Sequence, residues 1–175
     1  MEKEPQELFS RKLFFLILGA IFGAALPGVM TIAIDLHQKK LQRASLKASF
    51  AGEIQSLVKI VQTLEMKEEI QRSIDLMKKT GKKYPLIYSA KQDYFQVYKA
   101  NVPNLGLLDA TTAKNICIFY TNCFASVEYI NQLNSKEYLN KLNLRSAIKE
   151  HKQLIELLKG TEELGDPLVG LLTKK

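Results

Sequence analysis

The chain has 175 residues and a net charge of +7 at neutral pH, from 25 Lys and Arg against 18 Asp and Glu. This length is enough for one small domain with a single hydrophobic core. The lysines are interleaved with glutamates and accompany no nucleic-acid-binding motif, so the composition argues against a nucleic-acid partner. The two histidines lie far apart in the chain, which argues against a histidine-based metal or acid–base site.

The first element is an uncharged stretch of twenty-two residues, Leu13–Ile34, which follows a short polar leader of residues 1–12. At about 1.5 Å per residue a helix of this length reaches about 33 Å, enough to cross a hydrocarbon layer of about 30 Å. A cleaved signal peptide with its site at Gly23 and Ala25 is the competing interpretation. The apolar run continues to Ile34 without a polar break, which favours an uncleaved transmembrane helix over residues 13–34.

Basic residues flank this stretch, three before it and four after it. By the positive-inside rule this small excess predicts a single-pass protein of the inner (cytoplasmic) membrane with a cytoplasmic body. Basic side chains beside a bilayer are attracted to anionic headgroups. The sequence therefore predicts the lipid bilayer as a partner, contacted by Arg11, Lys12, Lys39, Lys40, Arg43 and Lys47.

Small residues recur at a spacing of four within the same stretch. Residues four apart share one face of a helix, and small side chains there let a second helix approach closely. The pattern predicts a packing face for a homodimer through the membrane helix, made of Gly19, Ala20, Gly23, Ala24 and Gly28.

Residues 35–81 are predicted to form a long juxtamembrane amphipathic helix. Its apolar seam has spacings of 4, 3, 4 and 3, as expected for one face of a helix. After Leu64 the register slips before the seam resumes, and Gly81 suits the left-handed position that follows a helix. The seam consists of Phe50, Ile54, Leu57, Val61 and Leu64, followed by Ile70, Ile74 and Met77.

Residues 82–109 are predicted to be a connector, because Pro85 disfavours helix at the residue before it. Ser89 and Gln92 have the spacing of a capping box, which predicts a short helix over residues 90–101. Two interpretations of the connector's aromatic residues stay open: they cover the end of the bundle, or they line a groove for a partner. This candidate partner surface consists of Tyr84, Tyr88, Tyr94, Phe95 and Tyr98.

Residues 110–160 are predicted to be a helical hairpin, with Asp109 as the N-cap of its first helix and Gly160 closing its second. Residues 161–175 are then a tail that frays, apart from a last turn of helix after Pro167. Cys117 and Cys123 share the first helix with their Cα atoms about 9 Å apart, too far for a disulfide.

We find no catalytic, cofactor-binding or metal-binding motif: no phosphate loop, no HExxH, no GxSxG and no CxxC. His151 lies on the apolar seam of the last helix. It is interpreted either as a histidine with one structural hydrogen bond or as a group that titrates near neutral pH.

Several short segments resemble a loose group of uncharacterised bacterial single-pass membrane proteins with a basic juxtamembrane helix and an all-helical body. They are Ala51–Ile54, Asp93–Asn101, Leu105–Leu108 and Phe119–Thr121, and the similarity covers residues 13–125. The resemblance implies a bacterial inner-membrane protein with a cytoplasmic body. It implies no catalytic residue, because the group has no assigned activity.

The sequence therefore predicts an all-α protein: one N-terminal transmembrane helix, a long amphipathic helix and a small helical bundle. The predicted function is a membrane-anchored interaction or scaffold protein without catalytic activity or cofactor, acting on an unknown protein partner. The alternative is a membrane-tethered extracytoplasmic sensor-like domain that binds a ligand.

Overall fold

The computed structural model describes residues 4–88, 90 and 92–174, and for residues 4–29 and Gln92 it describes the backbone alone. All regular structure in these residues is helical, which confirms the predicted all-α class and the helical bundle. The chain divides after Arg43 into two compact units, residues 1–43 and residues 44–175. Helix α1 (Glu4–Thr63) begins in the first unit and ends in the second.

In the first unit, every side chain from Met30 to Arg43 is exposed. Among the side chains described in this unit, only those of residues 30–34 precede the first charge, at Asp35. Lys39 forms an ion pair with Asp35 at 2.8 Å. A helix needs about twenty consecutive apolar residues to cross a bilayer. Among the described residues, no helix has the length and apolar character needed to cross a membrane.

This finding corrects the predicted single-pass placement in the inner membrane. The side chains of residues 13–29, most of the predicted span, lie outside the described part of the chain. The same holds for the predicted small-residue packing face (Gly19, Ala20, Gly23, Ala24 and Gly28) and for Arg11 and Lys12.

In the second unit, α1 ends at Thr63 and α2 (Met66–Thr80) begins after a short break. Glu65 takes a left-handed backbone conformation, with φ of 46°. The break falls where the apolar seam slips, so the two halves of the seam belong to two helices and both can face the core. Gly81 ends α2 in the predicted left-handed conformation, with φ of 70°.

The connector contains short helical elements: η1 (Gln92–Phe95), α3 (Gln96–Asn101) and η2 (Val102–Leu107). The predicted helix over residues 90–101 is therefore divided into a 3₁₀ turn and a short α-helix. The capping box falls on Ser89, which lies outside the described residues.

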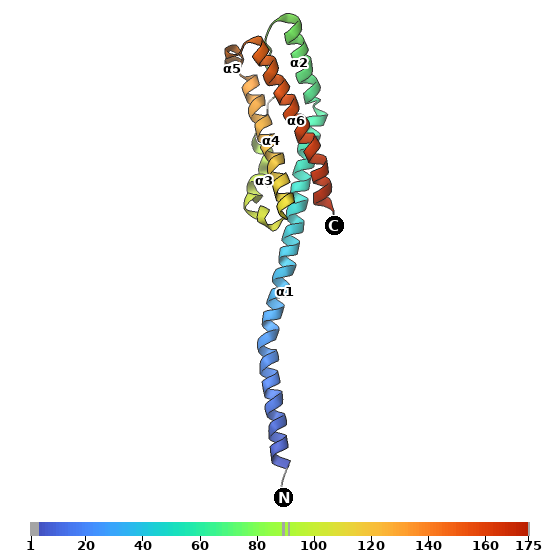
Figure 1. The fold of residues 1–175 in the computed structure, drawn as a ribbon, viewed down its shortest axis with the longest axis vertical. Coiled ribbons are helices and arrows are strands. Elements are labelled where there is room, and N and C mark those ends of the chain that lie inside the picture. Colours follow the sequence, from blue (N-terminus) through green and yellow to red (C-terminus); the bar gives the residue numbers. More distant parts are fainter. Residues whose placement is uncertain (1–3, 89, 91, 175) are drawn as a thin grey trace. The chain divides into compact units, whose positions relative to one another are not determined.

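The rest of the bundle is α4 (Ala110–Asn134), α5 (Lys136–Lys141) and α6 (Leu144–Thr173), with α2, α4 and α6 side by side in Figure 1. Asp109 caps α4 as predicted, accepting a hydrogen bond from the Thr112 backbone N–H at 2.9 Å. The second helix of the predicted hairpin is α6, which starts at Leu144 with Asn143 as its N-cap. The residues before it form the separate short helix α5.

Helix α6 continues through Gly160 and Pro167 to Thr173, whereas the sequence predicted an end at Gly160. Thr161, Gly165, Leu168 and Leu172 are buried along this extension. Packing of that face stabilises helix where local propensity alone does not. Pro167 removes the helical hydrogen bond to the carbonyl of Glu163; both residues are exposed, so water can satisfy that carbonyl.

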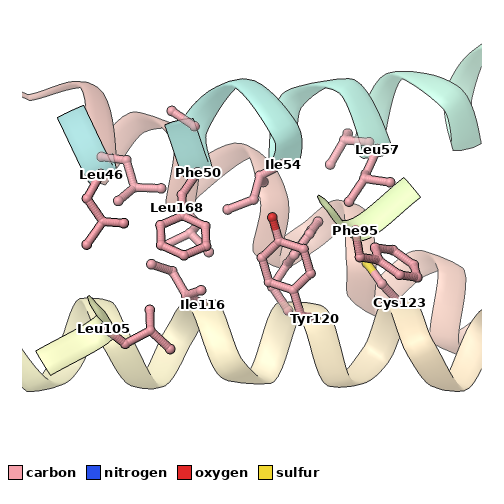
Figure 2. Close-up of a cluster of buried hydrophobic side chains, with 14 of the residues drawn as sticks. Leu46, Phe50, Ile54, Leu57, Phe95, Leu105, Ile116, Tyr120, Cys123 and Leu168 are labelled. Atoms are coloured by element: carbon pink, nitrogen blue, oxygen red, sulfur yellow. The ribbon is translucent and has the colours of Figure 1, made fainter. Parts of the chain in front are cut away.

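Two clusters of buried side chains form the core. One joins the final turns of α6 to α1, the connector and the first half of α4, around Phe50, Ile116 and Leu168 (Figure 2). The other joins α2, α5 and the start of α6 to the second half of α4, around Ile70, Leu133 and Leu154. The boundary between the clusters lies where α1 ends, and the candidate site is found there.

Candidate functional site

The structure separates the five aromatic residues of the predicted partner surface. Phe95 is fully buried and Tyr98 stacks on Tyr120 with ring centroids 4.1 Å apart, so both belong mainly to the core. Tyr84 is half-buried and donates a hydrogen bond to the Thr80 hydroxyl at 3.2 Å. Tyr88, Tyr94 and Phe95 line one common pocket.

This pocket has a volume of about 100 Å³ and lies where α1, the connector, α4 and α6 meet. Its walls are mainly apolar. We call it the apolar pocket; its lining residues are Leu57, Ile60, Val61, Leu64, Met66, Tyr88, Ala90, Tyr94, Phe95, Cys123, Ser126, Val127, Ile130, Leu158 and Thr161.

Three of the hydroxyl groups that line the apolar pocket are already hydrogen-bonded to backbone carbonyls. Ser126 donates to Asn122 at 2.8 Å and Thr161 donates to Leu157 at 2.9 Å, both within their own helices. The Tyr88 hydroxyl donates to the carbonyl of Leu64 at 3.1 Å. A ligand in the pocket therefore meets mainly apolar surface.

Cys123 is the one thiol that lines the apolar pocket. Burial raises the pKa of Cys123 to about 12, against the opposing effect of its contact with Thr161. Because the thiolate is the nucleophilic form, this thiol is inert at neutral pH. Cys123 is therefore not an activated nucleophile.

The mouth of the pocket is lined by exposed apolar side chains. Ile60 is 37%, Leu64 49% and Tyr94 45% exposed. Large apolar side chains exposed together around a concave site are typical of a binding surface. Ile60, Leu64 and Tyr94 are called the rim below.

Glu53 of α1 fixes the connector that forms one wall of the site. Its carboxylate accepts hydrogen bonds from the backbone N–H of Val97 at 2.7 Å and of Tyr98 at 3.0 Å. It also accepts one from the Tyr120 hydroxyl, which points from α4 toward α1 in Figure 2. Burial and the neighbouring Glu53 raise the pKa of Tyr120 far above its usual value, so the phenol stays protonated and keeps donating.

The structure describes the side chains of four of the six basic residues predicted to contact lipid headgroups. Lys39, Lys40 and Arg43 are exposed in the first unit, and Lys47 is half-buried at the start of the second.

Cys117 and Cys123 are both free thiols on α4, as the spacing predicted.

Among the residues that the structure describes, no group of three or more His, Cys, Asp or Glu side chains is arranged to hold a metal ion. Neither protein-family models, nor curated proteins, nor solved structures gave a match to this chain. The resemblance to bacterial single-pass membrane proteins therefore stays a prediction.

The aromatic surface predicted from the sequence contains three of the residues that line the apolar pocket, Tyr88, Tyr94 and Phe95. The pocket itself was not predicted. Its other walls come from helices distant in the sequence. Two features of the sequence could have indicated the pocket. One is the register slip after Leu64, and the other is the small side chains at Ala90, Cys123 and Ser126, where larger ones would fill the space.

Proposed function

We propose that this chain is a non-catalytic interaction protein whose helical bundle takes up one bulky apolar side chain of a protein partner in the apolar pocket. The observation that carries the proposal is a small apolar pocket whose mouth is surrounded by exposed apolar side chains. Interfaces commonly concentrate their binding energy in one such anchor residue.

The size of the pocket favours an anchor over a free ligand. Pockets for drug-sized ligands measure about 300–1,000 Å³. At about 100 Å³ this pocket fits a single side chain of the size of Leu or Phe. A small free ligand of that size would bury few atoms, and each atom contributes at most about 1.5 kcal/mol.

The rim supports the same proposal. Ile60, Leu64 and Tyr94 offer apolar surface outside the pocket, where the residues next to an anchor would rest. Full burial of one Leu or Phe side chain contributes about 1.5–3 kcal/mol, so a partner needs these additional contacts to reach micromolar affinity.

The experiment is a selection of displayed peptides that bind the full chain, followed by affinity measurement with pocket variants. We expect the selected peptides to share one bulky apolar residue. Ala90→Leu fills the pocket and Leu64→Ser removes an apolar rim residue, and each should weaken binding by about ten-fold or more. Ile118→Ser is the matched control, since Ile118 is an exposed apolar residue outside the pocket.

Binding that survives Ala90→Leu, in a variant with the helical content of the parent, would contradict the proposal. So would an equal loss in Ile118→Ser, because the peptides would then bind exposed apolar surface in general.

A further inference from the structure

The positive charge of the second unit is concentrated at one end of the bundle. Segments 78–83 and 136–152 together hold nine Lys and Arg against two acidic residues, a net charge of +7. The rest of residues 44–175 holds ten against twelve, a net charge of −2. Such an asymmetry creates a field that attracts an anionic partner to that end.

The two basic segments are neighbours in space. The Lys83 ammonium donates hydrogen bonds to the carbonyls of Leu139 and Leu142, each at 2.7 Å, which ties the end of α2 to the region between α5 and α6. In Figure 1 the end of α2 and helix α5 lie at the same end of the bundle. We call this region the basic end.

Most of these cations are available to a partner. Lys78 pairs with Asp75 and Lys141 with Glu137, while Lys83 is engaged with backbone carbonyls. The remaining six are exposed and have no ion pair or side-chain hydrogen bond within the described part of the chain: Lys79, Lys82, Lys136, Arg145, Lys149 and Lys152.

A groove between α4 and α6 begins at the basic end. Its volume is about 530 Å³. Lys149 and Lys152 line it on the side of the basic end, while Ala125, Tyr129 and Leu157 give it half-buried apolar surface. Asn122, Gln153 and Glu156 complete the lining of what we call the α4–α6 groove.

We propose that the α4–α6 groove binds a helical segment of a partner protein that is acidic at the basic end and apolar along one face. Acidic side chains would pair with Lys149 and Lys152, and apolar ones would cover Ala125 and Tyr129. An amphipathic helix in a groove between helices is a recurrent mode of recognition. This surface is separate from the apolar pocket and goes beyond the proposed function.

The groove favours a peptide over a nucleic acid. Phosphate contacts would use the lysines but leave the apolar surface without a partner, since most nucleic-acid hydrogen bonds go to phosphate and sugar.

The test uses the full chain and a fluorescent peptide of about 15 residues, near the length at which an isolated helix forms. The peptide contains Leu, Ala and Glu, with Leu on one helical face. A scrambled peptide of the same composition and an RNA duplex are the competitors. We expect the amphipathic peptide to bind better than the scrambled one, and more weakly at about 1 M salt, where charges are screened beyond about 3 Å.

The double variant Lys149→Glu/Lys152→Glu should weaken peptide binding by about ten-fold or more. Ala125→Gln, which fills the apolar part of the groove, should also weaken it. Lys114→Glu/Lys174→Glu is the matched control, because it makes the same change in net charge at exposed lysines outside the groove.

Equal binding of the scrambled peptide, or an equal loss in the control variant, would overturn the proposal, since only net charge would then matter. Stronger competition by the RNA duplex than by unlabelled peptide would overturn it in favour of a nucleic-acid partner.

Discussion

His151 is buried on α6 with none of its surface exposed, on the apolar seam where the sequence placed it. Its Nδ1 donates a hydrogen bond to the Ala147 carbonyl at 2.8 Å, while Nε2 has no partner among the described residues. Burial lowers the pKa of His151 below its usual 6.5, against the opposing effects of the Ala147 and Tyr84 backbone and of Glu150. The neutral ring is therefore the form that fits the folded chain.

This lowered pKa predicts a loss of stability on mild acidification. Because the unfolded chain binds the proton first, the contribution of His151 is complete above about pH 6.5 and is lost as the pH falls through the lower folded pKa. The free energy of unfolding, from urea titrations, should be lower at about pH 5.5 than at about pH 7.5.

His151→Leu should remove most of that difference. Hydrogen bonds from Thr112 hold the pKa of Asp109 below the usual 3.8. Asp109 therefore titrates below this pH interval and does not contribute to the difference in stability. A His151→Leu variant with the same pH dependence as the parent would show that another group titrates.

At the scale of elements, α6 packs closely against α1 at Gly165. A Cβ built on Gly165 would lie 2.3 Å from Cγ2 of Val58 and 3.1 Å from a ring carbon of Phe119. Carbon atoms in contact normally lie about 3.5–4.0 Å apart. Glycine is therefore required here for the helices to pack, although it lowers helix propensity.

Gly165→Ala should lower the free energy of unfolding by about 1–3 kcal/mol, the usual cost of overpacking a core. Gly170→Ala, on the same helix but with open space around it, should leave stability unchanged or raise it by up to about 1 kcal/mol. Urea titrations of the two variants measure the difference. Adding Val58→Ala to Gly165→Ala should make the loss smaller than the sum of the two single losses; strict additivity would contradict the clash.

At the scale of the whole molecule, the last turns of α6 complete the core cluster around α1. Leu168 and Leu172 are each 3% exposed and pack in the cluster that contains Phe50 and Ile116. Removing residues 161–175 would expose both leucines and the apolar surface that they cover. Burial of each side chain contributes about 1.5–3 kcal/mol, and a small domain is stable by only about 5–15 kcal/mol.

A chain that ends at Gly160 should therefore lose its cooperative unfolding transition, followed by circular dichroism during heating. A chain that ends at Thr173 lacks only exposed Lys174 and the final residue, and should unfold like the parent. A cooperative transition within a few degrees of the parent in the shorter chain would show that residues 161–175 add little to the core, as expected of the fraying tail that the sequence predicted.

Local signals in the sequence predicted much of the helical structure. The spacing of apolar residues predicted helix on both sides of Leu64, although as one helix over residues 35–81 where the structure has two. Asp109 gave the start of α4, and Gly81 gave the end of α2. Each of these depends on a few neighbouring residues: a side-chain oxygen that caps backbone N–H groups, or a backbone that favours the left-handed region.

Tertiary structure decided what local signals leave open. Helix α6 passes Gly160 and Pro167 because packing of Leu168 and Leu172 outweighs the local cost of those residues. The apolar pocket and the α4–α6 groove depend on side chains brought together from distant segments. The sequence determined by itself most of the helical segments and where the charges lie, because both depend mainly on local residues. Only the packed bundle decided which apolar surface stays uncovered, because that depends on the shapes of several helices at once.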